Sequence, residues 1–298
     1  MQPHLVLPFG TKVLVRLDGR VGLVVSAPEA GELWYQVRFA DGSEGDFARG
    51  ELSIFKHADA AVPALSDGEV LWDYVQLRCV VGSRAYGLDS ETSDVDRRGF
   101  YLPPSRLHWG LAGVPEQLEN ENEECYWEVE KFVRLALKAN PNVLECLYSP
   151  LVEYASPVAE ELISMRSAFL SRHIHRTYNS YVLSQFKKLE QDLRNRQGIR
   201  WKHVMHLIRL LLSGVLVLRE GFVPLRVDGH RDRLLAIRRG EVPWDEVEAW
   251  RLELHRDLDE AMRSTRLPEH PDYERANDFL IRARRFAALD VYEKGEND

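Results

Sequence analysis

The stretch GSRAYGLDSETSDVD, residues 82–96, decides how the rest of this chain is interpreted. Its Gly82-Ser83 turn offers unobstructed backbone N–H groups and a hydroxyl, which are the donors that a phosphate group needs. Asp94 and Asp96 are one residue apart, so in a strand both side chains point to the same face. Two carboxylates so close repel each other unless a cation lies between them, and Mg²⁺ binds through carboxylates beside substrate phosphates. The stretch therefore predicts metal-dependent chemistry on a nucleoside triphosphate.

The composition is that of an ordinary globular protein. The 298 residues, 45% hydrophobic and 29% charged, are enough for two or three compact units. No run reaches the roughly 20 apolar residues of a membrane span, and MQPHLVLPFG lacks a signal-peptide pattern. Cys79, Cys125 and Cys146 are scattered, which favours a reducing compartment over a disulfide scaffold or a zinc site. We therefore expect a cytoplasmic protein that does not enter a membrane.

Charge is distributed unevenly along the chain. The formal net charge is −8, yet residues 172–239 contain 15 Lys+Arg and only 5 Asp+Glu. A basic segment in an acidic protein suggests a phosphate-rich ligand, either a nucleotide or a nucleic acid. A solvated helical surface that pairs with the acidic first half explains the same charges equally well. Four arginines of this segment fit either interpretation: Arg231, Arg233, Arg238 and Arg239.

The chain divides into segments with different patterns. Asp-Gly pairs between alternating apolar runs predict hairpins near the N-terminus, and hence a small five-stranded barrel similar to SH3 or Tudor domains. ADAAVPALSD is typical of a linker. Strand-like and helix-like patterns then alternate, and a helical period continues to the C-terminus. We predict an α+β protein with a β-barrel over residues 1–57, a linker over 58–67, an α/β domain over 68–150 and a helical domain over 151–298.

A second group of candidate residues follows from helical geometry. On a helix that begins at Trp201, a polar stripe only ~60° wide contains Lys202, His206 and Arg209. The other sides of this helix are almost entirely apolar, so the helix is buried and the stripe faces a partner. A triphosphate fits this cationic stripe, and ion pairs with acidic residues of the other domain are the alternative.

One more stripe is ambiguous. Tyr178, Tyr181 and Gln185 follow a helical spacing. They are suited to contact a nucleotide base, although core packing with a polar edge explains the same spacing.

GSRAYGLDSETSDVDRRGFY resembles the signature of the nucleotidyltransferase superfamily typified by DNA polymerase beta. More narrowly, the chain is similar to bacterial nucleotidyltransferases of the RNA repair pathway DNA polymerase beta family. The similarity extends to WEVEKFVRLALKANPNVLECLYSP, WKHVMHLIRLL and LLAIRRGE, and covers residues 70–245. It implies a polymerase-beta-like fold for the α/β domain. It also implies that Ser83, at the Gly82 turn and with Arg84 beside it, holds the terminal phosphates. Asp94 and Asp96 would hold two Mg²⁺ ions, or Mn²⁺, and Lys202 would contact the phosphates.

Two-metal phosphoryl transfer requires a third carboxylate on a neighbouring strand. Glu128 is the favoured candidate because it matches the position that the resemblance implies, between two apolar residues of a short strand. Glu130 and Glu124 remain alternatives. The run of glutamates over residues 116–124 is interpreted as a flexible acidic loop.

These observations predict a Mg²⁺-dependent nucleotidyltransferase, which moves a nucleoside monophosphate from an NTP to an acceptor hydroxyl and releases pyrophosphate. An RNA 3′ end is the expected acceptor, while a protein hydroxyl, as in toxin-like nucleotidyltransferases, or a small molecule is an alternative. A non-catalytic nucleotide- or RNA-binding module is a different class that remains open. The near-neutral charge of residues 1–57, with 6 Lys+Arg and 7 Asp+Glu, favours a protein partner for the barrel.

Overall fold

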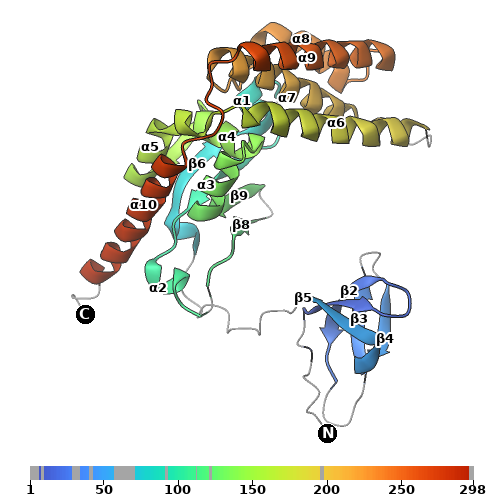
Figure 1. Cartoon of the computed structure of the whole chain (residues 1–298), viewed down its shortest axis with the longest axis vertical. Coiled ribbons are helices and arrows are strands. Elements are labelled where there is room, and N and C mark those ends of the chain that lie inside the picture. The colour runs from blue at the N-terminus through green and yellow to red at the C-terminus, as the bar shows by residue number, and fades with distance from the viewer. Residues whose placement is uncertain are drawn as a thin grey trace. The chain divides into compact units, whose positions relative to one another are not determined.

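The computed structural model divides the chain into two compact units, Met1–Glu69 and Val70–Asp298 (Figure 1). It describes residues 7, 10–28, 34–39, 43–56, 71–90, 93–111, 113–120, 123–194 and 198–294. The predicted linker over residues 58–67 lies outside these ranges.

The N-terminal unit contains a five-stranded antiparallel sheet. The predicted Asp18-Gly19 turn is present, because Gly19 has a φ of 72° and the Arg20 amide donates to the Asp18 carboxylate over 3.0 Å. The described residues show no pairing between the edge strands β4 and β5, so the antiparallel sheet is confirmed and a closed barrel is not. The strands follow the order β4-β3-β2-β1-β5: β1 Lys12–Val15, β2 Val21–Ser26, β3 Trp34–Phe39, β4 Glu44–Ala48 and β5 Leu52–Lys56, with the 3-10 turn η1 Arg49–Glu51 before β5.

The C-terminal unit is built on a second five-stranded sheet of order β10-β6-β7-β9-β8. Only β7 and β9 are parallel, and the other neighbours are antiparallel. The edge strand β8 lies in the segment interpreted as an acidic loop, so that interpretation is wrong for Gln117–Glu119. The strands are β6 Val75–Val80, β7 Arg97–Tyr101, β8 Gln117–Glu119, β9 Glu124–Glu128 and β10 Val152–Ala155, preceded by the 3-10 turn η2 Leu71–Tyr74.

Helices α3, α4 and α5 pack against one face of this sheet (Figure 1). Alternation along the strands turns apolar side chains such as Leu77, Cys79 and Phe100 toward these helices, and all three are fully buried. Asn140 caps α4 by accepting from the Asn142 amide over 3.0 Å, and Ser156 caps α5 in the same way. The short helices are α1 Gly82–Tyr86, α2 Ser105–His108, α3 Val129–Leu137, α4 Pro141–Tyr148, α5 Pro157–Ser164 and η3 Arg166–Phe169.

The residues after 150 are mostly helical, as predicted, but they do not stand apart from the sheet. Strand β10 pairs with β6, and the last helix, α10, packs back on α2 and α3. The α/β and helical segments therefore form one compact unit. The remaining elements are α6 His173–Arg194, α7 Trp201–Glu220, η4 Asp228–His230, α8 Arg231–Arg238, α9 Trp244–Ser264 and α10 Tyr273–Lys294.

Helix α7 is the central helix of this part and packs against α6, α8 and α9. By length and composition it is the one described helix that could cross a membrane, yet 72% of that window is buried inside the fold. It ends at Gly221, whose φ of 68° is the left-handed conformation that glycine adopts most easily at a helix C-terminus. The apolar residues thus make α7 a core helix, as its sequence predicts.

We expect Gly99→Ala to destabilise the C-terminal unit strongly. A Cβ at this position of β7 would meet the carbonyl oxygen of Leu77 in β6 at 1.8 Å, so the two strands would have to separate. The expected loss in the free energy of unfolding is about 3 kcal/mol or more, measured by urea denaturation. Gly229→Ala is the matched control, because nothing lies within 4 Å of its Cβ position, and it should leave stability nearly unchanged. Equal stability of the two variants would contradict this packing.

Candidate active site

The Gly82 turn and Asp96 meet where β6 ends and β7 begins. The Val81 amide donates to the Asp96 carbonyl over 2.9 Å. Gly82 has a φ of 71°, and a Cβ there would lie 2.3 Å from Oδ2 of Asp96. Only glycine therefore allows the turn to approach this carboxylate so closely. The two halves of the sequence motif are adjacent in space.

The two aspartates precede β7 rather than lying in it. The strand begins at Arg97, so the alternation of side chains in a strand, from which the two carboxylates were expected to share a face, does not apply to them. The Asp94 side chain is exposed, and that of Asp96 is 31% exposed. Nη2 of Arg98 lies 3.8 Å from Oδ1 of Asp96, at the outer limit of an ion pair. Both carboxylates therefore remain accessible to a ligand.

This donor set fits Mg²⁺. Among the described residues, no three His, Cys, Asp or Glu side chains come together as a metal cage. The chain instead offers two accessible hard-oxygen carboxylates, and the glycine of the turn allows the carboxylate of Asp96 to approach the turn closely. Mg²⁺ binds in this manner, through one or two carboxylates with substrate phosphates and water as its other ligands.

The backbone around the turn is held in place by α1 and by the segments that follow it. Arg84 donates to the Ser93 carbonyl over 3.0 Å, which fixes the residue before Asp94. The Leu88 amide donates to the Ser83 carbonyl over 2.9 Å. The Ser83 side chain remains half-buried beside Gly82. Arg84 thus positions the loop of the aspartates in this structure.

Helix α8 contacts the same region, which sequence reasoning missed. Arg231 donates to the Gly87 carbonyl over 2.8 Å, and Arg238 donates to the Leu88 carbonyl over 3.0 Å. The other two arginines also have partners within the protein: Arg233 stacks on Trp250, and Arg239 pairs with Glu241. Each of these four arginines therefore has a partner within the fold.

The structure does not bring Glu128 to the two aspartates. The parallel register pairs Arg97 with Glu124 and Tyr101 with Glu128. Glu128 is therefore roughly 13 Å further along the sheet than the end where Asp96 lies. Its buried carboxylate instead lies 2.6 Å from Nη2 of Arg284 in α10. This contact is an anchor between the sheet and the last helix.

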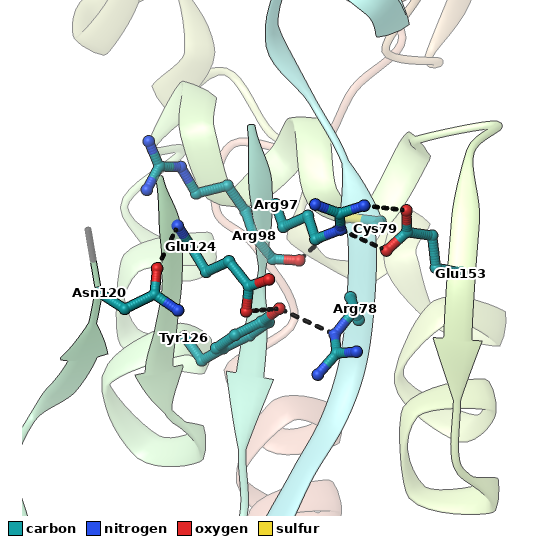
Figure 2. Close-up of polar contacts among 8 residues, drawn as sticks. All are labelled: Arg78, Cys79, Arg97, Arg98, Asn120, Glu124, Tyr126 and Glu153. Carbon is teal, nitrogen blue, oxygen red and sulfur yellow. Dashed lines mark hydrogen bonds and ion pairs between the residues drawn. The ribbon is translucent and has the colours of Figure 1, made fainter. Parts of the chain in front are cut away.

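The two alternative carboxylates also have other partners. Glu130 lies in the first turn of α3 and pairs with Arg134 over 2.8 Å. Glu124 lies at the correct end of β9, but its carboxylate contacts the Tyr126 hydroxyl over 3.2 Å. That hydroxyl also accepts from Arg78 over 2.9 Å, on the sheet face opposite α3 and α4 (Figure 2).

Arg97 belongs to the same polar face. Its guanidinium pairs with Glu153 of β10 over 2.8 Å, as Figure 2 shows. On β9's side, Glu123 contacts the residue that follows Asp96, because its carbonyl accepts from the Arg97 amide over 3.3 Å. Glu123 is exposed and has a φ of 58°. Sequence reasoning passed over it because it lies in the run of glutamates interpreted as a loop.

Arg209 is held by a buried ion pair. It contacts Glu145 of α4 over 2.8 Å, and its guanidinium stacks 3.7 Å from the ring centre of Tyr86 in α1. The Tyr86 hydroxyl donates to the same Glu145 carboxylate. Of the two interpretations of the α7 stripe, the ion pair therefore holds for Arg209. The network joins α1, which carries the Gly82 turn, to α4 and α7.

A cavity of about 410 Å³ lies next to this network, between α4, α6 and α7. Its lining includes Tyr86, Tyr181 and His206. Burial raises the pKa of Tyr86 well above its ordinary value, and Asp96 is among the charges that act on this ring. The charge of Asp96 therefore acts on one residue of the cavity lining, although neither aspartate lines the cavity itself. Lys202, by contrast, is exposed at the start of α7, and Gln185 lines a neighbouring cavity.

His206 is neutral in this environment. Burial, followed by the charges of Arg209 and Lys202, lowers its pKa to about 4. A neutral imidazole presents one donor and one acceptor to the cavity. It can therefore hydrogen-bond a polar ligand but carries no charge for a phosphate.

The pKa of His206 makes stability depend on pH. In the unfolded chain His206 binds a proton near pH 6.5, and in the folded chain only near pH 4, so unfolding takes up a proton between these values. Stability is full above pH 6.5 and falls as the pH is lowered. At pH 5 the loss from this residue is at most about 2 kcal/mol.

We expect His206→Gln to reduce the difference in unfolding free energy between pH 7 and pH 5 by at most about 2 kcal/mol. Urea denaturation at the two pH values measures it. An unchanged difference would contradict a neutral, buried His206.

Comparison of the sequence with known proteins identifies a family to which the chain is similar. The model of the RNA repair pathway DNA polymerase beta family matches residues 63–282. The uncharacterized protein YcgL of Bacillus subtilis (strain 168) is 28% identical over 148 residues, which are 48% of this chain and 56% of the relative. No solved structure matches the chain. Because the family match covers more than half of the chain and includes Gly82, Asp94 and Asp96, the chain belongs to the RNA repair pathway DNA polymerase beta family.

Proposed function

We propose that the protein transfers a nucleoside monophosphate from an NTP to an acceptor hydroxyl and releases pyrophosphate. The approach of Gly82 to Asp96 is the observation that carries this proposal. It combines a turn suited to phosphates with two accessible carboxylates suited to a divalent cation. The name of the family, a DNA polymerase beta family, supports the same class of reaction.

The residues of the chain have distinct roles in this proposal. Ser83 and the backbone amides of the turn bind the terminal phosphates of the NTP and orient its α-phosphate toward the aspartates. Asp94 and Asp96 hold Mg²⁺, which supplies charge neutralisation and a lower pKa for the acceptor hydroxyl when it is bound. Tyr86 and His206, which are more buried than the neighbouring Tyr181, line the part of the cavity that receives the nucleoside. The neutral His206 hydrogen-bonds the base or the sugar there.

Asp94→Asn and Asp96→Asn test the reaction. Each change removes a negative charge with almost no change of shape, so we expect transfer to fall by roughly 10³-fold or more. The release of pyrophosphate from each NTP, with Mg²⁺ and total cellular RNA, is the measurement. Asp89→Asn, at an exposed aspartate nearby, is the matched control and should retain activity. Full activity in both Asp94→Asn and Asp96→Asn would overturn the proposal.

We propose Glu123, rather than Glu128, as the third carboxylate. Glu123 is the described glutamate whose backbone contacts Arg97, the residue after Asp96. We expect Glu123→Gln to lower kcat by roughly 100-fold while the melting temperature is unchanged.

Glu128→Gln should have the opposite signature. It leaves the buried Arg284 with only the Glu130 carboxylate, 3.8 Å away, as a charge partner, so it should lower the free energy of unfolding by about 3 kcal/mol but preserve the kcat of the folded protein. Loss of kcat in Glu128→Gln at full stability would restore Glu128 as the candidate.

RNA is the proposed acceptor, supported by the family's description as part of an RNA repair pathway. Incubation with each α-labelled NTP and a cytoplasmic extract separates the alternatives, because the label appears on RNA, on protein or on neither. We further propose a cytoplasmic location and a protein partner for the N-terminal unit, from the cysteine usage and the near-neutral charge of residues 1–57.

A further inference from the structure

A second cavity lies between the C-terminal half of α6 and the start of α7. Its volume is about 450 Å³, and its lining consists of Gln185, Lys188, Leu189, Gln191, Arg200 and His203. Two cations, two amides and an imidazole thus face one space, and no carboxylate is among the described side chains of its lining. Such a lining is suited to an anion.

The two cations of this cavity are not consumed by the fold. Within the described ranges, neither Lys188 nor Arg200 forms an ion pair, whereas all four arginines discussed above near α8 have partners. Burial lowers the pKa of His203, and the charges of Arg200 and Lys188 lower it further. The imidazole therefore experiences the positive potential of both side chains. An anion in the cavity would relieve it.

This cavity adjoins the cavity of about 410 Å³ described above. Both are lined by His203, and both follow the groove between the antiparallel helices α6 and α7. Tyr181, which is 47% exposed, lies in the first cavity, and Lys188 lies two turns further along α6, roughly 10 Å away. The groove thus offers an accessible aromatic ring and then two cations.

We infer that this groove binds single-stranded RNA, with a base stacked on Tyr181 and a backbone phosphate held by Lys188 and Arg200. Proteins bind single strands by this combination of an aromatic ring and a basic track. An acidic protein segment would satisfy the cations but would leave the tyrosine ring without a planar partner. The inference names the acceptor class of the proposed function and rests on it.

The test is the binding of a fluorescein-labelled single-stranded RNA oligonucleotide, measured by fluorescence anisotropy between 50 and 200 mM salt. We expect the double variant Lys188→Ala/Arg200→Ala to bind the RNA more weakly than the wild type. The plot of log affinity against log salt concentration should also become less steep by about 1.4, which is about 0.7 for each lost phosphate contact. Tyr181→Ala should weaken the binding of RNA on the order of tenfold. Tyr181→Phe should bind RNA with the affinity of the wild type, because the aromatic ring remains.

Lys187→Ala is the matched control, since Lys187 is the exposed neighbour of Lys188 on α6 and does not line the cavity. It should retain the affinity and the salt dependence of the wild type, apart from a small decrease in affinity because the protein carries one positive charge fewer. A double variant that keeps the wild-type slope, or a wild type that binds poly-glutamate in preference to RNA, would overturn the inference.

The RNA assay does not depend on transfer. We expect Asp96→Asn to bind the oligonucleotide with wild-type affinity, because Asp96 is not part of the groove lining. Failure of RNA binding with intact transfer to another acceptor rejects the groove and keeps the proposed reaction. Intact binding in a wild type that transfers nothing rejects the reaction and keeps the groove.

Discussion

The buried ion pair between Arg209 and Glu145 is the interaction on which the C-terminal unit depends. Both side chains are nearly inaccessible to water, so each charge requires the other. Tyr86 contacts both charged groups, because its hydroxyl donates to the Glu145 carboxylate and its ring covers the Arg209 guanidinium. The three residues come from α7, α4 and α1. One buried network therefore fixes α1, which begins at the Gly82 turn, relative to the helices that line the cavity.

Local features of the fold and of the site could be predicted from the sequence because they depend on neighbours along the chain. The Gly82 turn, the Asp18-Gly19 hairpin and the buried character of α7 follow from backbone freedom or from helical period. Such features need no knowledge of distant contacts. The family resemblance, carried by residues 82–96, was confirmed for the same reason.

The features that failed depend on register and on partners far along the chain. Glu128 lies between apolar residues, as expected of a carboxylate in a strand. Only the pairing of β7 with β9 reveals that it lies at the end of β9 away from Asp96. Arg209 has the chemistry of a phosphate ligand, but its role is settled by Glu145, which is 64 residues earlier in the sequence. A side-chain pattern on one element does not specify the element that it faces.

The contact between Glu128 and Arg284 has a consequence for how the protein is made. Glu128 belongs to the central sheet, yet its counterion is in the last helix, close to the C-terminus. During synthesis the ribosome releases the sheet long before α10 is available. Until then this carboxylate can accept from the Glu130 amide, but it lacks the counterion that accompanies it in the folded protein. The unit therefore completes its fold only after α10 has been synthesised, and a chain truncated before α10 lacks this contact between the sheet and the helix.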